Sequence, residues 1–167
     1  MGRIGDLKKM ISEGRFGFTM DEVMTGTHRF EPEFGDDKER FMEFRVTWGP
    51  KNMTRFANPF GGGFMKNDLA GTVTIDGLCY NAPCSGALEL NYFSEARIRY
   101  TFDFEVKGVK YHFVGEKVNI KPWNLPVSHT TCFGVLKEAE SGRLVSRSVT
   151  FFRLKTSLAF LASLRLA

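Results

Sequence analysis

The chain has 167 residues, with 23 lysine and arginine and 19 aspartate and glutamate residues, so its formal net charge is +4. This length fits one domain of ordinary size, and the mild charge excludes a dedicated nucleic-acid binder. Aromatic residues make up 14% of the chain, with 17 phenylalanines among them, so large rings must either fill the interior or line a pocket.

The number of cysteines and the lack of long apolar runs both bear on the cellular compartment of the protein. Cys79, Cys84 and Cys132 give an odd number of thiols. Met1–Gly14 is polar and charged, unlike a signal peptide, and no apolar run reaches the length of a membrane span. The sequence therefore predicts a cytoplasmic protein with reduced cysteines and no transmembrane segment.

The first part of the chain predicts a helix and then a long strand. Apolar residues at helical spacing in residues 1–14 indicate a short N-terminal helix. Phe16–Phe30 alternates as a strand, and this alternation places Glu22 on the inward face among apolar side chains. Gly26 is expected to kink or bulge the strand.

A strand and a long connection follow an acidic turn. Phe41–Trp48 alternates with Trp48 on the inward face. Gly49–Asp68 has no clean period and carries aromatic residues around Gly61–Gly63. Connections of this length often bind ligands, so it is either a flap that closes over something apolar or a loop that plugs one barrel end. The next predicted strands are Ala70–Leu78 and Ala87–Phe93, with a turn region around Pro83 between them.

The clearest pattern is a β-hairpin over Ala96–Val118. Its first strand points alternate side chains inward: Ile98, Tyr100, Phe102, Phe104 and Val106. Lys107-Gly108 supplies a two-residue turn, which fixes the register of the second strand. The expected partners are Phe104 with Tyr111, Phe102 with Phe113, Glu105 with Lys110, Asp103 with His112, and Arg99 with Glu116. No like charges face each other in this register, and a slip of one residue would turn the aromatic rings outward.

The remaining elements complete the fold prediction. Thr130–Ala139 and Arg143–Leu154 read as a hairpin, and Ser157–Leu166 as a closing helix. About eight strands in neighbouring hairpins predict an all-β protein, an antiparallel up-and-down barrel with short N- and C-terminal helices. Residues 1–167 then form a single domain, whose barrel has room for a filled core or one small ligand.

The predicted inner wall carries two charged side chains. The alternation that places Phe113 inside also places Lys117 inside, so Lys117 and Glu22 either form a polar pair in an apolar cavity or lie at the open end and reach water. In a cavity they would anchor the polar end of a ligand. The candidate ligand-binding residues are Glu22, Trp48, Tyr100, Phe102, Phe104, Tyr111, Phe113 and Lys117.

Common catalytic and cofactor signatures are missing. The chain has no dinucleotide, phosphate-loop, nucleophile-elbow or zinc-protease motif. Cys79 and Cys84 have no second cysteine pair that would complete a zinc site. We therefore expect no metal and no cofactor, and the sequence assigns no catalytic residue.

Five sequence motifs carry a resemblance to a known family. They are F-T-M-D-E-V-M-T-G-T, L-A-G-T-V-T-I-D-G-L, V-K-G-V-K-Y-H-F-V-G-E-K, H-T-T-C-F-G-V-L and F-F-R-L-K-T-S-L-A-F-L-A-S-L-R. Their order resembles a small accessory domain that accompanies bacterial cholesterol-oxidase-like enzymes of the glucose–methanol–choline oxidoreductases. The chain departs from the family at the N-terminal helix and at Trp123. The resemblance implies steroid, sterol or other lipid metabolism. It also implies an oxidoreductase or hydrolase partner, and flavin chemistry would belong to the oxidoreductase.

Three hypotheses about function follow. The first is a lipid-binding barrel, lipocalin-like in architecture, that holds a sterol, a steroid, a fatty acyl chain or another apolar ligand. The second is a small barrel enzyme, an isomerase or cyclase, for which Glu22 and Lys117 are the only acid–base candidates. The third is a protein-interaction module with a filled core, whose partner docks on the basic Arg143–Arg165 region.

Overall fold

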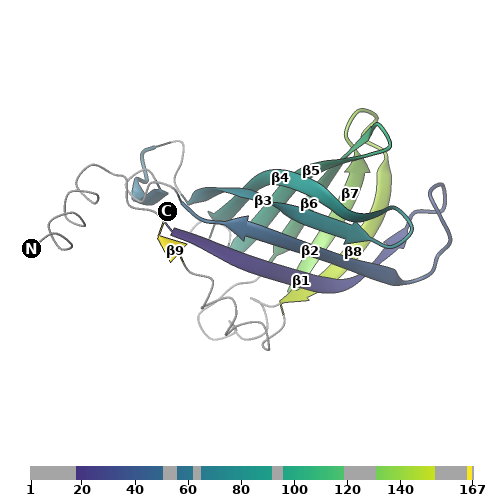
Figure 1. Ribbon diagram of the computed structural model, residues 1–167, viewed down its shortest axis with the longest axis horizontal. Helices are drawn as coiled ribbons and strands as arrows, with labels where there is room; N and C mark the ends of the chain where they lie inside the picture. The colour runs from purple at the N-terminus through teal and green to yellow at the C-terminus, as the bar shows by residue number, and fades with distance from the viewer. Residues whose placement is uncertain are drawn as a thin grey trace, which may run out of the picture.

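Eight antiparallel strands close into a barrel, which confirms the predicted fold (Figure 1). The computed structural model describes residues 18–50, 56–61, 65–91, 96–118, 131–152 and 165–166. The strands are β1 Phe18–Phe30, β2 Arg40–Trp48, β3 Lys66–Ile75, β4 Cys79–Asn91, β5 Arg97–Val106, β6 Val109–Lys117, β7 Thr131–Glu138 and β8 Leu144–Phe152. Each strand from β1 to β7 pairs with the next one, and β1 also pairs with β8, so the eight strands close on themselves and none is an edge strand over its whole length.

The first strand joins the two sides of the barrel. Met20–His28 of β1 pairs with β2, and Met24–Phe30 pairs with β8. The register stays continuous across Gly26, so there is no bulge at this residue. A Cβ atom at Gly26 would overlap the carbonyl oxygen of Val149 on β8. Glycine is therefore required where β1 crosses closest to its neighbour.

The central hairpin has the register that the sequence predicts. Phe104 lies opposite Tyr111, and Phe102 lies opposite Phe113. The turn residues Lys107 and Gly108 have φ values of 51° and 82°. Positive φ at both central residues is the geometry that matches the twist of the flanking strands.

The turn region predicted around Pro83 is wrong. β4 runs without interruption from Cys79 to Asn91, and Pro83 lies opposite Thr72 of β3. The pairing of β4 with β5 begins at Cys84, so β4 has a neighbour on only one side at the proline. A residue without an N–H group is tolerated at such a place. β3 also begins at Lys66, earlier than the predicted connection allows.

The closing helix predicted for Ser157–Leu166 is wrong at its end. Arg165–Leu166 forms a ninth strand, β9, which pairs with Phe18 and Thr19 of β1. β1 extends beyond its pairing with β2, which ends at Met20, so the backbone groups of Phe18 and Thr19 can accept another strand. Residues 157–164 and the predicted helix over residues 1–14 lie outside the described residues. In the described part, no helix is long and apolar enough to cross a membrane.

The two ends of the barrel differ. Four short connections join β1 to β2, β3 to β4, β5 to β6 and β7 to β8 at the end opposite β9 (Figure 1). We call this the hairpin end. The other end, which we call the Lys117 end, contains the last residues of β2, β6 and β8, which are Trp48, Lys117 and Phe152.

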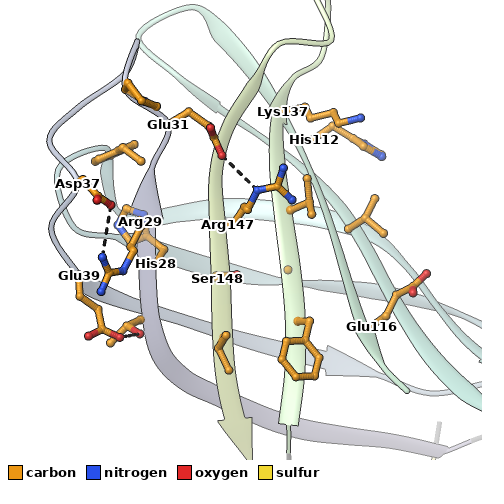
Figure 2. Close-up of a pocket in the computed structure, with 18 of the residues that line it drawn as sticks. His28, Arg29, Glu31, Asp37, Glu39, His112, Glu116, Lys137, Arg147 and Ser148 are labelled. Atoms are coloured by element: carbon orange, nitrogen blue, oxygen red, sulfur yellow. Dashed lines mark hydrogen bonds and ion pairs between the residues drawn. The ribbon is translucent and has the colours of Figure 1, made fainter. Parts of the chain in front are cut away.

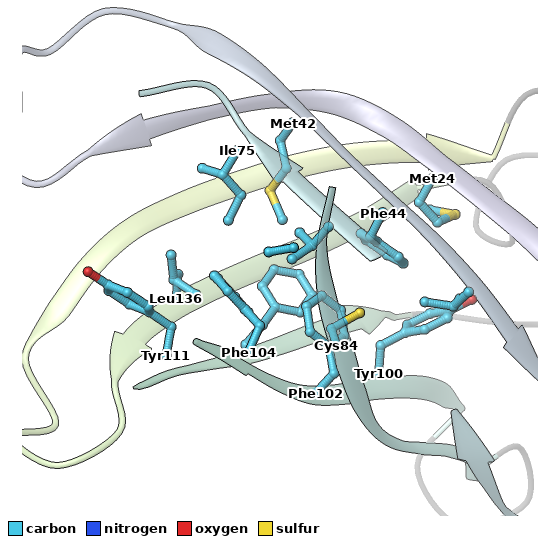
Figure 3. Packing of buried hydrophobic residues seen from close by; sticks show 14 of the residues in the cluster. Met24, Met42, Phe44, Ile75, Cys84, Tyr100, Phe102, Phe104, Tyr111 and Leu136 are labelled. Atoms are coloured by element: carbon cyan, nitrogen blue, oxygen red, sulfur yellow. The ribbon is translucent and has the colours of Figure 1, made fainter. Parts of the chain in front are cut away.

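Aromatic rings fill the middle of the barrel (Figure 3). The Phe44 ring centroid lies 5.6 Å from that of Tyr100, 5.5 Å from that of Phe102 and 5.6 Å from that of Phe113. The Phe102 and Phe113 rings stack at 4.6 Å. These rings come from β2, β5 and β6, so their contacts hold opposite walls of the barrel together.

Two inward glycines make room for Phe113. Gly115 on β6 lies opposite Gly134 on β7. A Cβ atom at Gly134 would lie 2.5 Å from Cε2 of the Phe113 ring, and one at Gly115 would lie 2.8 Å from its Cε1. The ring therefore rests directly on the backbone of two strands, which leaves no empty space beneath it.

Candidate functional site

A buried ion pair lies at the Lys117 end of the barrel interior. The Lys117 ammonium donates a hydrogen bond of 2.8 Å to Oε1 of Glu22, and the two side chains are 3% and 5% exposed. Glu22 is on β1 and Lys117 is on β6, which lie on opposite sides of the barrel. Of the two arrangements that the sequence left open, the structure shows the polar pair and not two side chains in water.

The Glu22 carboxylate accepts further hydrogen bonds. The Tyr100 hydroxyl lies 2.9 Å from Oε1 and 3.0 Å from Oε2, and Nε1 of Trp48 donates to Oε2 at 3.0 Å. With Lys117, three donors from three strands converge on one carboxylate. Such contacts compensate for the loss of water around a buried charge.

The Lys117 ammonium has fewer partners. Its nitrogen lies 5.2 Å from the centre of the Tyr100 ring and 5.7 Å from that of Phe152, and both ring faces attract a cation. An ammonium has three N–H groups, and Glu22 is its one hydrogen-bond acceptor among the described residues. Two donor positions of a buried cation are therefore available to a further acceptor.

Asn67 is a second incompletely satisfied polar group on the inner wall. It is 3% exposed, and neither its amide nitrogen nor its amide oxygen has a hydrogen bond within the described part of the chain. Asn67 on β3 lies opposite Leu88, and Leu88 lies opposite Tyr100. Two strand spacings place the Cα atoms of Asn67 and Tyr100 about 10 Å apart. Buried amides normally have partners, so this one also has capacity for a ligand.

Half-buried apolar side chains also lie at the Lys117 end, where Glu22, Lys117 and Asn67 are. Trp48, Leu90 and Phe152 pack against the core and stay partly accessible. All three are at or near the ends of their strands at the Lys117 end. The site thus combines a few fixed polar groups with apolar surface, the usual composition of a small-molecule site.

The other candidate residues lie on the inner wall as predicted. Phe102 and Phe113 are buried in the packed middle, and Phe104 stacks on Tyr111 at 5.4 Å towards the hairpin end. The strand register places them nearer the hairpin end than Tyr100 and Lys117, so they lie deeper in the barrel than the Glu22–Lys117 pair. Direct contact between these four rings and a ligand stays a prediction.

The buried thiols are not suited to nucleophilic chemistry. Burial raises the pKa of Cys132 to about 12, even though Lys117 lowers it. Burial also raises the pKa of Cys84 to about 11. Both thiols therefore stay protonated at neutral pH, and the thiolate is the reactive form. Among the described residues, no group of three or more histidine, cysteine, aspartate or glutamate side chains could hold a metal ion.

The two histidines that the structure describes, His28 and His112, do not lie in one site. His112 contacts Asp103 at 2.5 Å on the outer face, as the predicted register requires. His28 is buried near the hairpin end, where its Nε2 donates to the backbone oxygen of Asp76 at 3.0 Å. His129 lies outside the described residues.

Acid is expected to destabilise the fold through His28. Burial lowers the pKa of His28, against a smaller opposing effect of Asp76. An unfolded histidine has a pKa of about 6.5, so below this pH the unfolded chain binds a proton that native His28 does not. The free energy of unfolding should therefore decrease as the pH falls below about 6.5 towards the lower native pKa. Denaturant titrations between pH 8 and pH 5 should show a smaller loss for His28→Gln than for the wild type. Equal losses would show that His28 makes no contribution.

A groove on the outer face was not predicted from the sequence. It encloses about 1240 Å³ and runs over the outside of β1, β8, β7 and β6 (Figure 2). Its apolar lining includes Phe133 and Val135, and ion pairs flank it. These are Arg29–Asp37 at 3.3 Å and Arg147–Glu31 at 3.2 Å. The outward apolar residues of β6 and β7 were the available signal in the sequence.

The basic region near the C-terminus is largely neutralised where the structure describes it. Arg143 pairs with Glu138 at 3.0 Å and with Glu33 at 3.8 Å, and Arg147 pairs with Glu31. These exposed pairs contribute little stability, but they reduce the positive charge offered to an acidic partner. The hypothesis of a partner that docks there has no additional support from these residues.

The fold and the inner site together define a class, an eight-stranded up-and-down β-barrel with a buried ion pair at one end. No protein-family model, curated protein or solved structure matches the chain. The resemblance to oxidoreductase accessory domains therefore stays a prediction from the five motifs.

Proposed function

We propose that the barrel binds an apolar small molecule at its Lys117 end and that Lys117 contacts the polar group of this ligand. The observation that carries the proposal is the incompletely bonded ammonium, which is buried yet has one acceptor among the described residues. Buried polar groups without partners are costly, since each loses its hydrogen bonds to water. A ligand acceptor at this position would remove that cost and fix the orientation of the ligand.

Stability alone is a weak reason for a charged pair in this interior. Replacing a buried ion pair by well-packed apolar side chains is often neutral or stabilising, because desolvation offsets the attraction of the charges. Glu22 and Lys117 lie just above an aromatic core that could have continued to the end of the barrel. A binding role explains why charged side chains lie at this position, whereas packing alone does not.

The geometry supports binding better than acid–base catalysis. Each oxygen of the Glu22 carboxylate already accepts a hydrogen bond, from Lys117 at Oε1 and from Trp48 at Oε2, and the single Tyr100 O–H is shared between them. A general base must reach the proton that it removes. Three donor groups already contact this carboxylate, which restricts its access to a substrate proton.

The wider context of the proposal comes from the sequence resemblance. An accessory role in lipid or steroid metabolism would have this chain hold an apolar molecule near an oxidoreductase or hydrolase partner. The inner site supports the binding part of this role through its apolar rim and fixed polar groups. The partner belongs to the resemblance alone.

The neutral dye Nile red, an apolar ketone that fluoresces in apolar surroundings, tests the binding site. Wild-type protein should give saturable fluorescence, and Leu90→Glu should weaken the affinity by about tenfold or more, because a carboxylate would enter the apolar rim. Leu78→Glu is the matched control. Leu78 is also half-buried against the core, but it lies at the hairpin end, so its variant should bind like the wild type.

Two outcomes would contradict the proposed site. Equal loss of dye binding in both leucine variants would mean that binding depends on general stability and not on the Lys117 end. The absence of saturable binding to folded wild-type protein would mean that the barrel does not accept an apolar molecule of this kind. Circular dichroism of each variant establishes that it is folded before the titration.

A further inference from the structure

We infer that the polar group of the ligand is an uncharged hydrogen-bond acceptor, an alcohol or a ketone, and not a carboxylate. This inference rests on the proposed function and specifies the ligand of the same site. It follows from the charge and hydrogen-bond capacity of the Lys117 end.

The buried charges at this end already balance. Glu22 and Lys117 are the buried carboxylate and the buried ammonium among the described residues, and they contribute one negative and one positive charge. His28 is buried near the hairpin end, and burial lowers its pKa. A ligand carboxylate would add a second negative charge, and the part of the chain that the structure describes has no second buried lysine or arginine to compensate for it. An uncompensated charge in an apolar interior is strongly unfavourable.

The position of Glu22 adds a direct repulsion. The Glu22 oxygen lies 2.8 Å from the ammonium nitrogen. A second acceptor at a similar distance on the same tetrahedral nitrogen would lie within about 5 Å of that oxygen. Two carboxylates at this separation disfavour each other's charged forms, whereas an alcohol or carbonyl oxygen accepts from the ammonium without this penalty.

The hydrogen-bonding groups that remain available at the site also suit an uncharged ligand group. Lys117 offers N–H donors, and the buried amide of Asn67 offers both a donor and an acceptor. The ring faces of Tyr100 and Phe152 lie near the ammonium and supply apolar contact beside it. A molecule with an apolar body and a hydroxyl or keto group matches both the polar and the apolar parts of the site.

Oleyl alcohol and oleate test the inference because they share one chain and differ in the charge of the end group. In calorimetric titrations of the wild type at pH 8, below the micelle concentration of oleate and the solubility limit of oleyl alcohol, oleyl alcohol should bind about tenfold or more tightly than oleate. Equal or tighter binding of oleate would overturn the inference and leave the proposed function intact. Failure of both ligands to bind would overturn both.

A charge change at Glu22 provides a second, independent measurement. Glu22→Gln removes the negative charge and leaves Lys117 uncompensated, so the preference should shift towards oleate by about tenfold or more. Asp21→Asn is the matched control, because Asp21 is the exposed neighbour on the outer face of β1. It should keep the wild-type preference. An unchanged preference in folded Glu22→Gln would contradict the charge argument. If that variant does not fold, the titrations of the wild type with oleyl alcohol and oleate test the inference by themselves.

Discussion

Replacing Lys117 by methionine is expected to lower the free energy of unfolding by about 3–5 kcal/mol. Methionine keeps much of the apolar length of lysine but leaves the Glu22 carboxylate buried without its cation. Tyr100 and Trp48 would still donate to the carboxylate, but neither carries a charge. Denaturant titration with an optical readout of unfolding measures the loss.

Two further variants separate the ion pair from general effects of the substitution. Lys117→Met combined with Glu22→Leu removes both charges and should recover most of the lost stability. Lys110→Met, on the exposed outer face of the same strand, should change the stability by less than about 0.5 kcal/mol. A double variant no more stable than Lys117→Met would contradict the buried-charge explanation.

Replacing Phe44 by alanine is expected to cost about 3–5 kcal/mol. The Phe44 ring is fully buried and contacts the rings of Tyr100, Phe102 and Phe113 from the opposite wall. Its removal would leave a cavity in the middle of the barrel and abolish these three ring contacts. Denaturant titration gives the change in the free energy of unfolding.

Phe41 provides the matched control for Phe44. It lies on the same strand, is 46% exposed and points outward. Phe41→Ala should therefore cost less than about 1 kcal/mol. Similar small losses for both variants would show that the middle of the barrel is loosely packed, and the ligand would then have space well below the Lys117 end.

The alternation of side chains carries most of the fold prediction. In the central hairpin, strict alternation and the Lys107-Gly108 turn fix the register, so the facing of Phe102 and Phe113 follows from the sequence. The same alternation places Glu22 and Lys117 on inner walls. Periodicity of this kind is a local property, and it predicts a face well.

The contact between Glu22 and Lys117 needs more than alternation. The two residues are 95 positions apart, and they meet only because closure of the barrel brings β1 across from β6. The sequence therefore leaves open whether they pair or reach water. The hydrogen bond from Trp48 to Glu22 joins the neighbouring strands β2 and β1 over 26 positions. The pattern predicts that both side chains face inward but not that they touch.

Two errors have local causes that the structure explains. Pro83 suggests a turn, yet it lies in β4 just beyond the pairing with β5, where a missing N–H group costs little. Arg165–Leu166 belongs to a helix-like pattern, but the unpaired start of β1 offers backbone partners for a strand. In both places the tertiary arrangement decides between local preferences.

Native mass spectrometry of protein purified from cells, together with a lipid extract, tests the central claim most directly. Our account predicts a bound apolar molecule with a hydroxyl or keto group, retained by the wild type and by Leu78→Glu and lost in Leu90→Glu. Protein that keeps its ligand-free mass after exposure to the lipid extract would contradict the account, because an unoccupied Lys117 end would then be the normal state of the barrel.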